Sequence, residues 1–162
     1  MNTFDILTLP GMAGSLLLSA FPATDEIIDC YAAADTGLVI SLTPSPEMDL
    51  MGMPPDLLDR HCRERGMAWR HMAVADMGVA GSAALEAWRE IGPLAHGLLD
   101  AGRTVAIHCR MGLGRTGTLA GILLVERGLA PGEAIAAIRR ARRGSIETIR
   151  QEAMIRAWAA RR

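Results

Sequence analysis

A cysteine and an arginine separated by five residues lie where a short apolar stretch runs into a glycine-containing loop. The segment from Val105 to Gly117 reads VAIHCRMGLGRTG. Backbone N–H groups between a strand and a helix converge on one point, and the helix dipole reinforces the resulting anion site. Gly112 and Gly114 allow the crowded or positive-φ conformations that turn these amides inward. The segment therefore predicts a cradle for an oxyanion such as phosphate, and Arg115 adds a planar fork that can bind two of its oxygens.

Cys109 is expected at the mouth of this cradle and is the candidate nucleophile. Helix N-termini and nearby cations lower the pKa of a cysteine from about 8.5 to about 3.5–7.5, and the thiolate can attack phosphorus to form a phosphocysteine. The loop amides would then stabilise the charge on the transferring phosphoryl group. We expect His108 to orient the loop through hydrogen bonds to its carbonyl groups, and Thr116 to hydrogen-bond the departing sulfur.

The complete pattern is more specific than any of its parts. An isolated cysteine after a buried strand is more often an inert core residue. A nucleotide-binding P-loop is excluded, because the Gly-Lys-Ser/Thr ending is missing and the chain contains no lysine. The segment instead resembles the signature loop of the cysteine-dependent protein tyrosine and dual-specificity phosphatases. The resemblance implies that Cys109 is the nucleophile, Arg115 the phosphate-binding arginine and Thr116 the hydroxyl that assists the thiolate. It also implies that phosphate is bound by the backbone amides of Arg110, Met111, Gly112, Leu113, Gly114 and Arg115.

This chemistry needs an acid, since an alkoxide leaves poorly without a proton. The predicted loop from 74 to 81 contains one acidic residue, Asp76, which lies 33 residues before Cys109. The loop resembles the Pro-x-x-Asp-x-Gly-x-Pro loop of the same phosphatases, with alanines in place of both prolines. The resemblance implies that Asp76 is the general acid, whereas a turn residue or a helix-capping acid is the alternative.

The stretch from Arg142 to Gln151 resembles the Arg-x-Gly-x-Ile-x-Thr-x-x-Gln segment of phosphatases similar to the cyclin-dependent kinase-associated and Cdc14-type enzymes. In some relatives that glutamine positions the hydrolytic water. Gln151 is therefore either a water-positioning residue or an ordinary exposed helix residue. The arginines at 139, 140, 142 and 143 form a cluster that is either a solvated surface or a patch that attracts an anionic substrate.

Alternating short apolar runs and helix-length segments predict one α/β domain spanning residues 1–162. By resemblance this is a three-layer sandwich, with a central, mostly parallel sheet of about five strands between helices. Thr43–Pro55, rich in proline, methionine and glycine, is expected to be an irregular loop, and Pro93 to kink or end a helix. Strands are expected near residues 15–19, 38–42, 67–73 and 104–107, and helices near 24–34, 55–65, 82–99, 115–127, 131–143 and 147–160.

Composition excludes several classes of protein. The chain has 162 residues, 50% apolar and 22% charged, with a net charge of −1, and no apolar stretch approaches the ~18–20 residues needed to span a bilayer. Residues 1–59 contain nine of the 18 acidic residues and none of the 17 basic ones. Aromatic residues are only 4% and none interleave with the arginines, which argues against nucleic-acid binding. The four histidines show no metal-ligand spacing, so no metal or cofactor is expected.

Three cysteines are too few for a secreted disulfide framework and favour a cytoplasmic location. Cys30 and Cys62 are expected to be packing residues, although either could act as a resolving thiol for Cys109. The expected partner is a phosphorylated protein or a small phosphomonoester.

The favoured function is hydrolysis of phosphotyrosine, and of phosphoserine or phosphothreonine, in proteins. Arg110 adds charge beside the phosphate and leaves open a phosphoinositide or another small polyanion. A non-catalytic phosphate-binding pseudophosphatase is the alternative from a different class, and rhodanese-like sulfur or arsenate chemistry is a further alternative.

Overall fold

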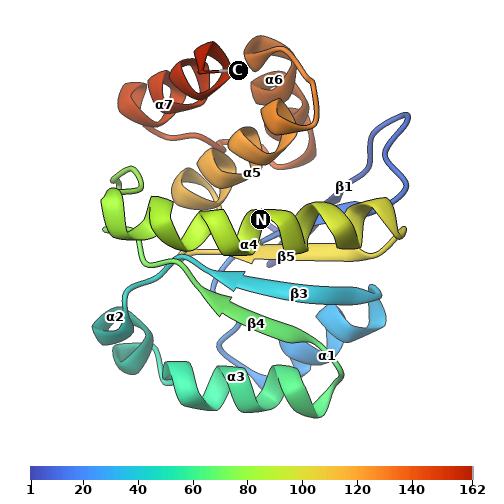
Figure 1. The fold of residues 1–162 in the computed structure, drawn as a ribbon. Coiled ribbons are helices and arrows are strands. Elements are labelled where there is room, and N and C mark those ends of the chain that lie inside the picture. Colours follow the sequence, from blue (N-terminus) through green and yellow to red (C-terminus); the bar gives the residue numbers. More distant parts are fainter. Residues whose placement is uncertain (162) are drawn as a thin grey trace.

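A five-stranded sheet forms the centre of the protein, in a computed structural model that describes residues 1–161 (Figure 1). The strand order is β1-β2-β5-β3-β4. β1 pairs with β2 in antiparallel fashion, whereas all other neighbours are parallel. The mostly parallel sheet expected from the sequence is therefore confirmed. The strands are β1 (Phe4–Leu7), β2 (Ser15–Ser19), β3 (Thr36–Ser41), β4 (Ala68–His71) and β5 (Thr104–His108).

Helices cover both faces of the sheet, which gives the expected three-layer sandwich (Figure 1). One layer packs on β3 and β4 and consists of α1 (Asp25–Ala33), α2 (Ser45–Leu50) and α3 (Pro55–Glu64). The other layer consists of α4 (Ser82–Asp100), α5 (Gly114–Glu126), α6 (Pro131–Ala141) and α7 (Ile149–Ala160). Within residues 1–161, no helix is both long enough and apolar enough to cross a membrane.

The apolar runs of the central strands reflect burial on both sides. In β2, Leu16 and Leu18 pack into the core beneath α4–α7, whereas Leu17 packs into the core beneath α1–α3. The same alternation occurs in β5, where Val105 and Ala106 belong to different cores. Because successive side chains point to opposite faces, a strand between two helical layers has no polar face.

One local expectation is wrong, a second is settled in part, and one strand was not expected. Thr43–Pro55 is not wholly irregular, because α2 forms within it and has a proline in its first turn, where the missing N–H costs nothing. Pro93 does not end its helix, since α4 continues through it to Asp100, and the kink that was the other alternative stays a prediction. The sequence analysis also did not expect β1, a four-residue edge strand.

The loop after β5 begins at the carboxyl end of a central strand of the sheet and leads directly into α5. In open α/β sheets, ligands bind at the carboxyl ends of the strands. The segments that follow β3 and β4 begin at the same edge, because these strands run parallel to β5. The fold thus brings α2 and the loop containing Asp76 to the cysteine loop.

Candidate active site

The backbone carbonyls of residues 110–113 all accept hydrogen bonds from groups outside the loop. Phe21 N donates to Arg110 O at 3.0 Å. The Arg142 side chain donates to Met111 O and to Gly112 O, both at 2.9 Å. Gly117 N and Ile146 N both donate to Leu113 O at 3.0 Å. Within residues 1–161, no amide of residues 110–113 donates a hydrogen bond to the protein. A loop with its carbonyls engaged from outside and its amides unengaged has the polarity of an oxyanion site.

Gly112 is required by the packing of this loop. Its φ is +74°, a left-handed conformation that L side chains rarely adopt. A Cβ at this position would lie 2.3 Å from the carbonyl carbon of Ser19, which is backbone and cannot rotate away. The loop can therefore lie against the end of β2 only with glycine at this position.

Cys109 lies deeper than the mouth of the cradle, where the sequence analysis expected it. Only 3% of its surface is exposed, and it packs in the core beneath α4–α7. The reason is its position directly after β5, a strand buried along its whole length. Arg110 and Met111, in contrast, are exposed.

The hydroxyl of Thr116 is buried and makes no hydrogen bond within the described residues. It therefore makes no hydrogen bond to the Cys109 sulfur here, and the expected bond to the departing sulfur stays a prediction. A buried hydroxyl without a partner is uncommon, because its desolvation is uncompensated. Thr116 Oγ1 accordingly keeps its hydrogen-bonding capacity.

Arg115 is held by a carboxylate that the sequence analysis did not identify. Glu47, on α2, accepts hydrogen bonds from both terminal nitrogens of Arg115, at 3.1 Å each. The Arg115 side chain is 2% exposed and that of Glu47 19%. This paired geometry fixes the plane of the guanidinium as well as its charge.

The acid loop contacts the same guanidinium. Arg115 Nη1 donates to the carbonyl oxygen of Val74 at 3.0 Å, and Nη2 donates to Asp76 Oδ1 at 3.2 Å. Asp76 Oδ1 also accepts from the backbone N–H of Met77 at 2.9 Å. The Asp76 side chain is 58% exposed, so it can move into solvent at little cost. The structure thus brings the loop of Asp76 to the cysteine loop, and it adds an ion pair between Asp76 and Arg115 that the sequence did not predict.

Burial by itself would lower the pKa of Arg115, but its hydrogen bonds to Glu47 and the nearby charges of Cys109, Glu47 and Asp76 raise it above its usual value. Arg115 therefore remains a cation at every pH at which the protein is folded. The interaction with Cys109 also places a potential thiolate within the electrostatic reach of this cation.

His108 is a neutral imidazole with an assignable tautomer. Complete burial lowers its pKa to about 3. Its Nδ1 lies 3.3 Å from the carbonyl oxygen of Cys109, which can only accept, so Nδ1 carries the hydrogen. Nε2 must then accept from the hydroxyl of Ser41, which in turn accepts from Trp69 Nε1 at 2.8 Å. His108 thus contacts a loop carbonyl, as expected.

Gln151 is not the exposed helix residue that was the alternative, because it is fully buried. Its Oε1 accepts from the N–H groups of Glu147 and Thr148, at 2.9 and 3.1 Å, which forms a capping box at the start of α7. Its Nε2 donates to the carbonyl oxygen of Gly78 at 3.1 Å. Gln151 thereby joins α7 to the loop that carries Asp76.

The sequence analysis missed Glu47 and misjudged Arg142. Arg142 belongs neither to a solvated surface nor to a steering patch, since 1% of its side chain is exposed. Pro46, at the first turn of α2, could have indicated a helix start after β3 and hence an ordered Glu47. No local signal distinguishes Arg142 from the exposed Arg143, because its burial results from long-range contacts.

The other two cysteines lie away from this site. Cys62 packs in the core beneath α1–α3, on the opposite side of the sheet from the core that contains Cys109. Burial raises the pKa of the Cys62 thiol to about 12, which makes it a poor nucleophile. Cys30 is exposed on α1, and all three cysteines are free. Among the described residues, no cluster of three His, Cys, Asp or Glu side chains could hold a metal ion.

Comparison with known proteins agrees with this geometry. A family model described as the DSP-PTPase phosphatase of polymorphic toxin systems matches residues 26–129, more than half of the chain. The chain belongs to this family. It is thus a member of the protein tyrosine and dual-specificity phosphatase superfamily, as the resemblance of the cysteine loop implied.

Among the curated relatives of this phosphatase, the "Probable protein tyrosine phosphatase type IVA A" of Dictyostelium discoideum is 38% identical over 81 residues. The match covers 50% of this chain and 48% of the relative, so the chain matches about half of that protein's length.

Three solved structures share the fold of the phosphatase. Tk-PTP in its active form is 27% identical, with a TM-score of 0.75 and coverage of 96% of this chain and 100% of the other. The kinase associated phosphatase KAP is 23% identical, with a TM-score of 0.84 and coverage of 98% and 94%. PTPMT1 in complex with PI(5)P is 17% identical, with a TM-score of 0.80 and coverage of 99% and 96%.

Proposed function

We propose that this phosphatase hydrolyses phosphomonoesters through a phosphocysteine on Cys109, with phosphotyrosine and phosphoserine or phosphothreonine in proteins as substrates. The observation that carries the proposal is the arrangement of the 110–113 loop, whose four carbonyls are engaged from outside while its amides are unengaged. Cys109 at its base and Arg115 at its end complete a site for a tetrahedral oxyanion.

In the first step, the Cys109 thiolate attacks phosphorus and the bond from phosphorus to the ester oxygen breaks. That oxygen takes the proton of Asp76 and leaves as an alcohol or phenol. The loop amides and Arg115 bind the equatorial oxygens, where charge must be stabilised in the transition state. The negative charge on the phosphoryl group develops close to donors that are already oriented. Glu47 fixes the Arg115 guanidinium, and the hydrogen bonds to the loop carbonyls fix the loop amides.

In the second step, water attacks the phosphocysteine and the phosphorus–sulfur bond breaks. Asp76, now a carboxylate, accepts the proton of the water, and inorganic phosphate and the thiolate are formed. Thr116 has a hydroxyl with no other partner and can donate a hydrogen bond to the departing sulfur. Gln151 serves this step by fixing the loop of Asp76 through Gly78, and it is our candidate for orienting the water.

Substrate binding must also displace Asp76. The four terminal N–H groups of Arg115 are engaged by Glu47, Val74 and Asp76, so only the Nε–H is left for a ligand. A phosphate that binds through Nε and Nη2 therefore takes the position of Asp76 on Nη2. Displacement releases the Asp76 carboxyl group from Arg115, so that it can turn toward the leaving oxygen.

A small polyanionic substrate, such as a phosphoinositide, is the second candidate. It is favoured by the exposure of Arg110 in the loop, where a guanidinium can contact a second phosphate beside the reacting one. PTPMT1, which shares the fold, has been solved with PI(5)P bound.

Turnover of p-nitrophenyl phosphate by the wild type and by Cys109→Ser tests the mechanism. We expect the variant to lose all measurable turnover, and equal activity would eliminate Cys109 as the nucleophile. An inactive wild type that still binds a phosphopeptide would favour a non-catalytic reader. Comparison of kcat/KM for phosphopeptides and soluble phosphoinositides tests the substrate, and a preference above about tenfold for the lipid headgroups would assign the second candidate.

A further inference from the structure

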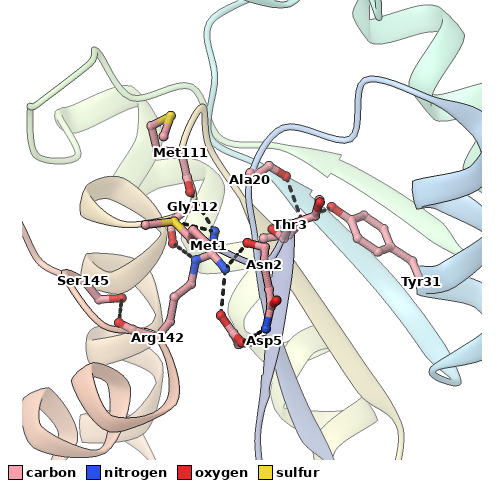
Figure 2. A network of polar contacts seen from close by, with 11 residues as sticks. Met1, Asn2, Thr3, Asp5, Ala20, Tyr31, Met111, Gly112, Arg142 and Ser145 are labelled. Atoms are coloured by element: carbon pink, nitrogen blue, oxygen red, sulfur yellow. Dashed lines mark hydrogen bonds and ion pairs between the residues drawn. The ribbon is translucent and has the colours of Figure 1, made fainter.

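Arg142 joins the cysteine loop to the first strand of the protein (Figure 2). Its Nε donates to Gly112 O and its Nη2 to Met111 O, both at 2.9 Å. Its Nη1 donates to Asp5 Oδ2 at 2.8 Å and to Asn2 O at 3.0 Å. One side chain therefore contacts two consecutive carbonyls of the phosphate loop and a carboxylate on β1.

These contacts determine the direction of two peptide groups. When the carbonyls of Met111 and Gly112 point toward Arg142, the N–H groups of the same peptide planes point the opposite way. The rigid fork of a guanidinium holds two adjacent carbonyls in fixed directions, whereas the three donors of an ammonium group can rotate.

A buried guanidinium needs a counter-ion. Only 1% of the Arg142 side chain is exposed, and an unpaired charge at this depth would be strongly unfavourable. Asp5 is the carboxylate that Arg142 pairs with in the described chain, and its side chain is 24% exposed.

The position of Asp5 is itself fixed by β1. Asp5 pairs with Leu18 in the antiparallel ladder between β1 and β2. Beyond the end of the ladder, Ala20 N donates to Thr3 O at 2.8 Å. The same network continues through Ser19 to the hydroxyl of Tyr31 (Figure 2).

We propose that Asp5, acting through Arg142, is a positioning residue for the phosphate-binding amides of the catalytic loop. Neither side chain contacts the substrate. Asp5 pairs with the buried charge of Arg142 and orients its guanidinium, and Arg142 keeps the Met111 and Gly112 carbonyls turned away from the phosphate. The proposal concerns the reaction described above and rests on that function, but part of it can be tested without turnover.

Asp5→Asn keeps the shape of the side chain and removes its charge. Asp100→Asn is the matched control, because Asp100 forms an ion pair of 2.7 Å with Arg127, outside the catalytic site. We expect Asp5→Asn to lower kcat/KM for p-nitrophenyl phosphate by about 10- to 100-fold, since small displacements of positioned groups have effects of this size. Arg142→Lys, which keeps the charge but not the fork, should have a similar effect.

Hydrogen exchange measured by NMR provides a readout that does not need activity. The amides of Phe21 and Ile146 donate to the carbonyls of Arg110 and Leu113, which flank the pair held by Arg142. We expect Asp5→Asn to lower the protection of these two amides by about tenfold. Protection of Val39 in β3 should remain at the level found in Asp100→Asn.

The proposal is overturned if Asp5→Asn matches Asp100→Asn within twofold in kcat/KM and in the protection of Phe21 and Ile146. Loss of protection at Val39 as well would show a general loss of stability and would also reject a specific positioning role. If the wild type has no turnover and Asp5→Asn still loosens Phe21 and Ile146 selectively, the proposed function fails but the coupling of Asp5 to the loop is upheld.

Discussion

Replacement of Glu47 by glutamine removes one of the two carboxylate oxygens that hold Arg115, and places an amide N–H₂ against a guanidinium that can only donate. Hydrogen bonds to charged groups contribute about 1.5–3 kcal/mol each. The Glu47 side chain is only 19% exposed, so we expect the substitution to reduce transition-state stabilisation by about 2 kcal/mol through poorer alignment of Arg115. At about 1.4 kcal/mol per factor of ten, this predicts a decrease in kcat/KM of about 30-fold.

Steady-state hydrolysis of p-nitrophenyl phosphate measures this effect, and urea unfolding checks that the variant is folded. Asp49→Asn is the control, because it removes the same charge from the same helix at an exposed position. The reasoning is refuted if Glu47→Gln remains within threefold of Asp49→Asn while both proteins are fully folded.

Three further changes have defined outcomes. Asp76→Ala should slow esters with poor leaving groups by about 10²–10⁴-fold and esters with good leaving groups far less, and a uniform loss would mean that another residue is the acid. Gly112→Ala should abolish tungstate binding measured by calorimetry, because a Cβ there meets Ser19 backbone at 2.3 Å; retained affinity would contradict the packing argument. Burial lowers the pKa of His108 to about 3 in the folded protein, whereas a histidine in the unfolded chain titrates near ~6.5. Between these two pH values the unfolded chain therefore binds a proton that the folded chain does not. The free energy of unfolding should therefore fall by about 2 kcal/mol between pH 6.5 and 5, and urea unfolding of His108→Asn should lack this decrease.

The parts of the site that are local in sequence could be predicted. The loop from Cys109 to Arg115 lies between a strand and a helix whose apolar patterns are clear, and Gly112 in it has a conformational reason. Asp76 could also be predicted from the sequence, because it is the one acidic residue of a loop that follows a strand.

The parts that depend on contacts between distant segments could not be predicted. Arg142 and Arg143 are adjacent arginines at the end of one helix, yet one is buried and the other exposed. Glu47 lies in a six-residue helix too short to show an apolar periodicity. β1 has four residues at an edge of the sheet, and its placement depends on pairing with β2 rather than on its own sequence.

The partners of the two central arginines come from remote parts of the chain: 68 positions separate Arg115 from Glu47, and 137 separate Arg142 from Asp5. A polypeptide still being translated can therefore build most of its sheet without a finished catalytic centre, as long as residue 142 remains inside the ribosome. We expect translation products that stop before this residue to lack the contacts that hold the Met111 and Gly112 carbonyls, so the phosphate loop is completed only after residue 142 has left the ribosome.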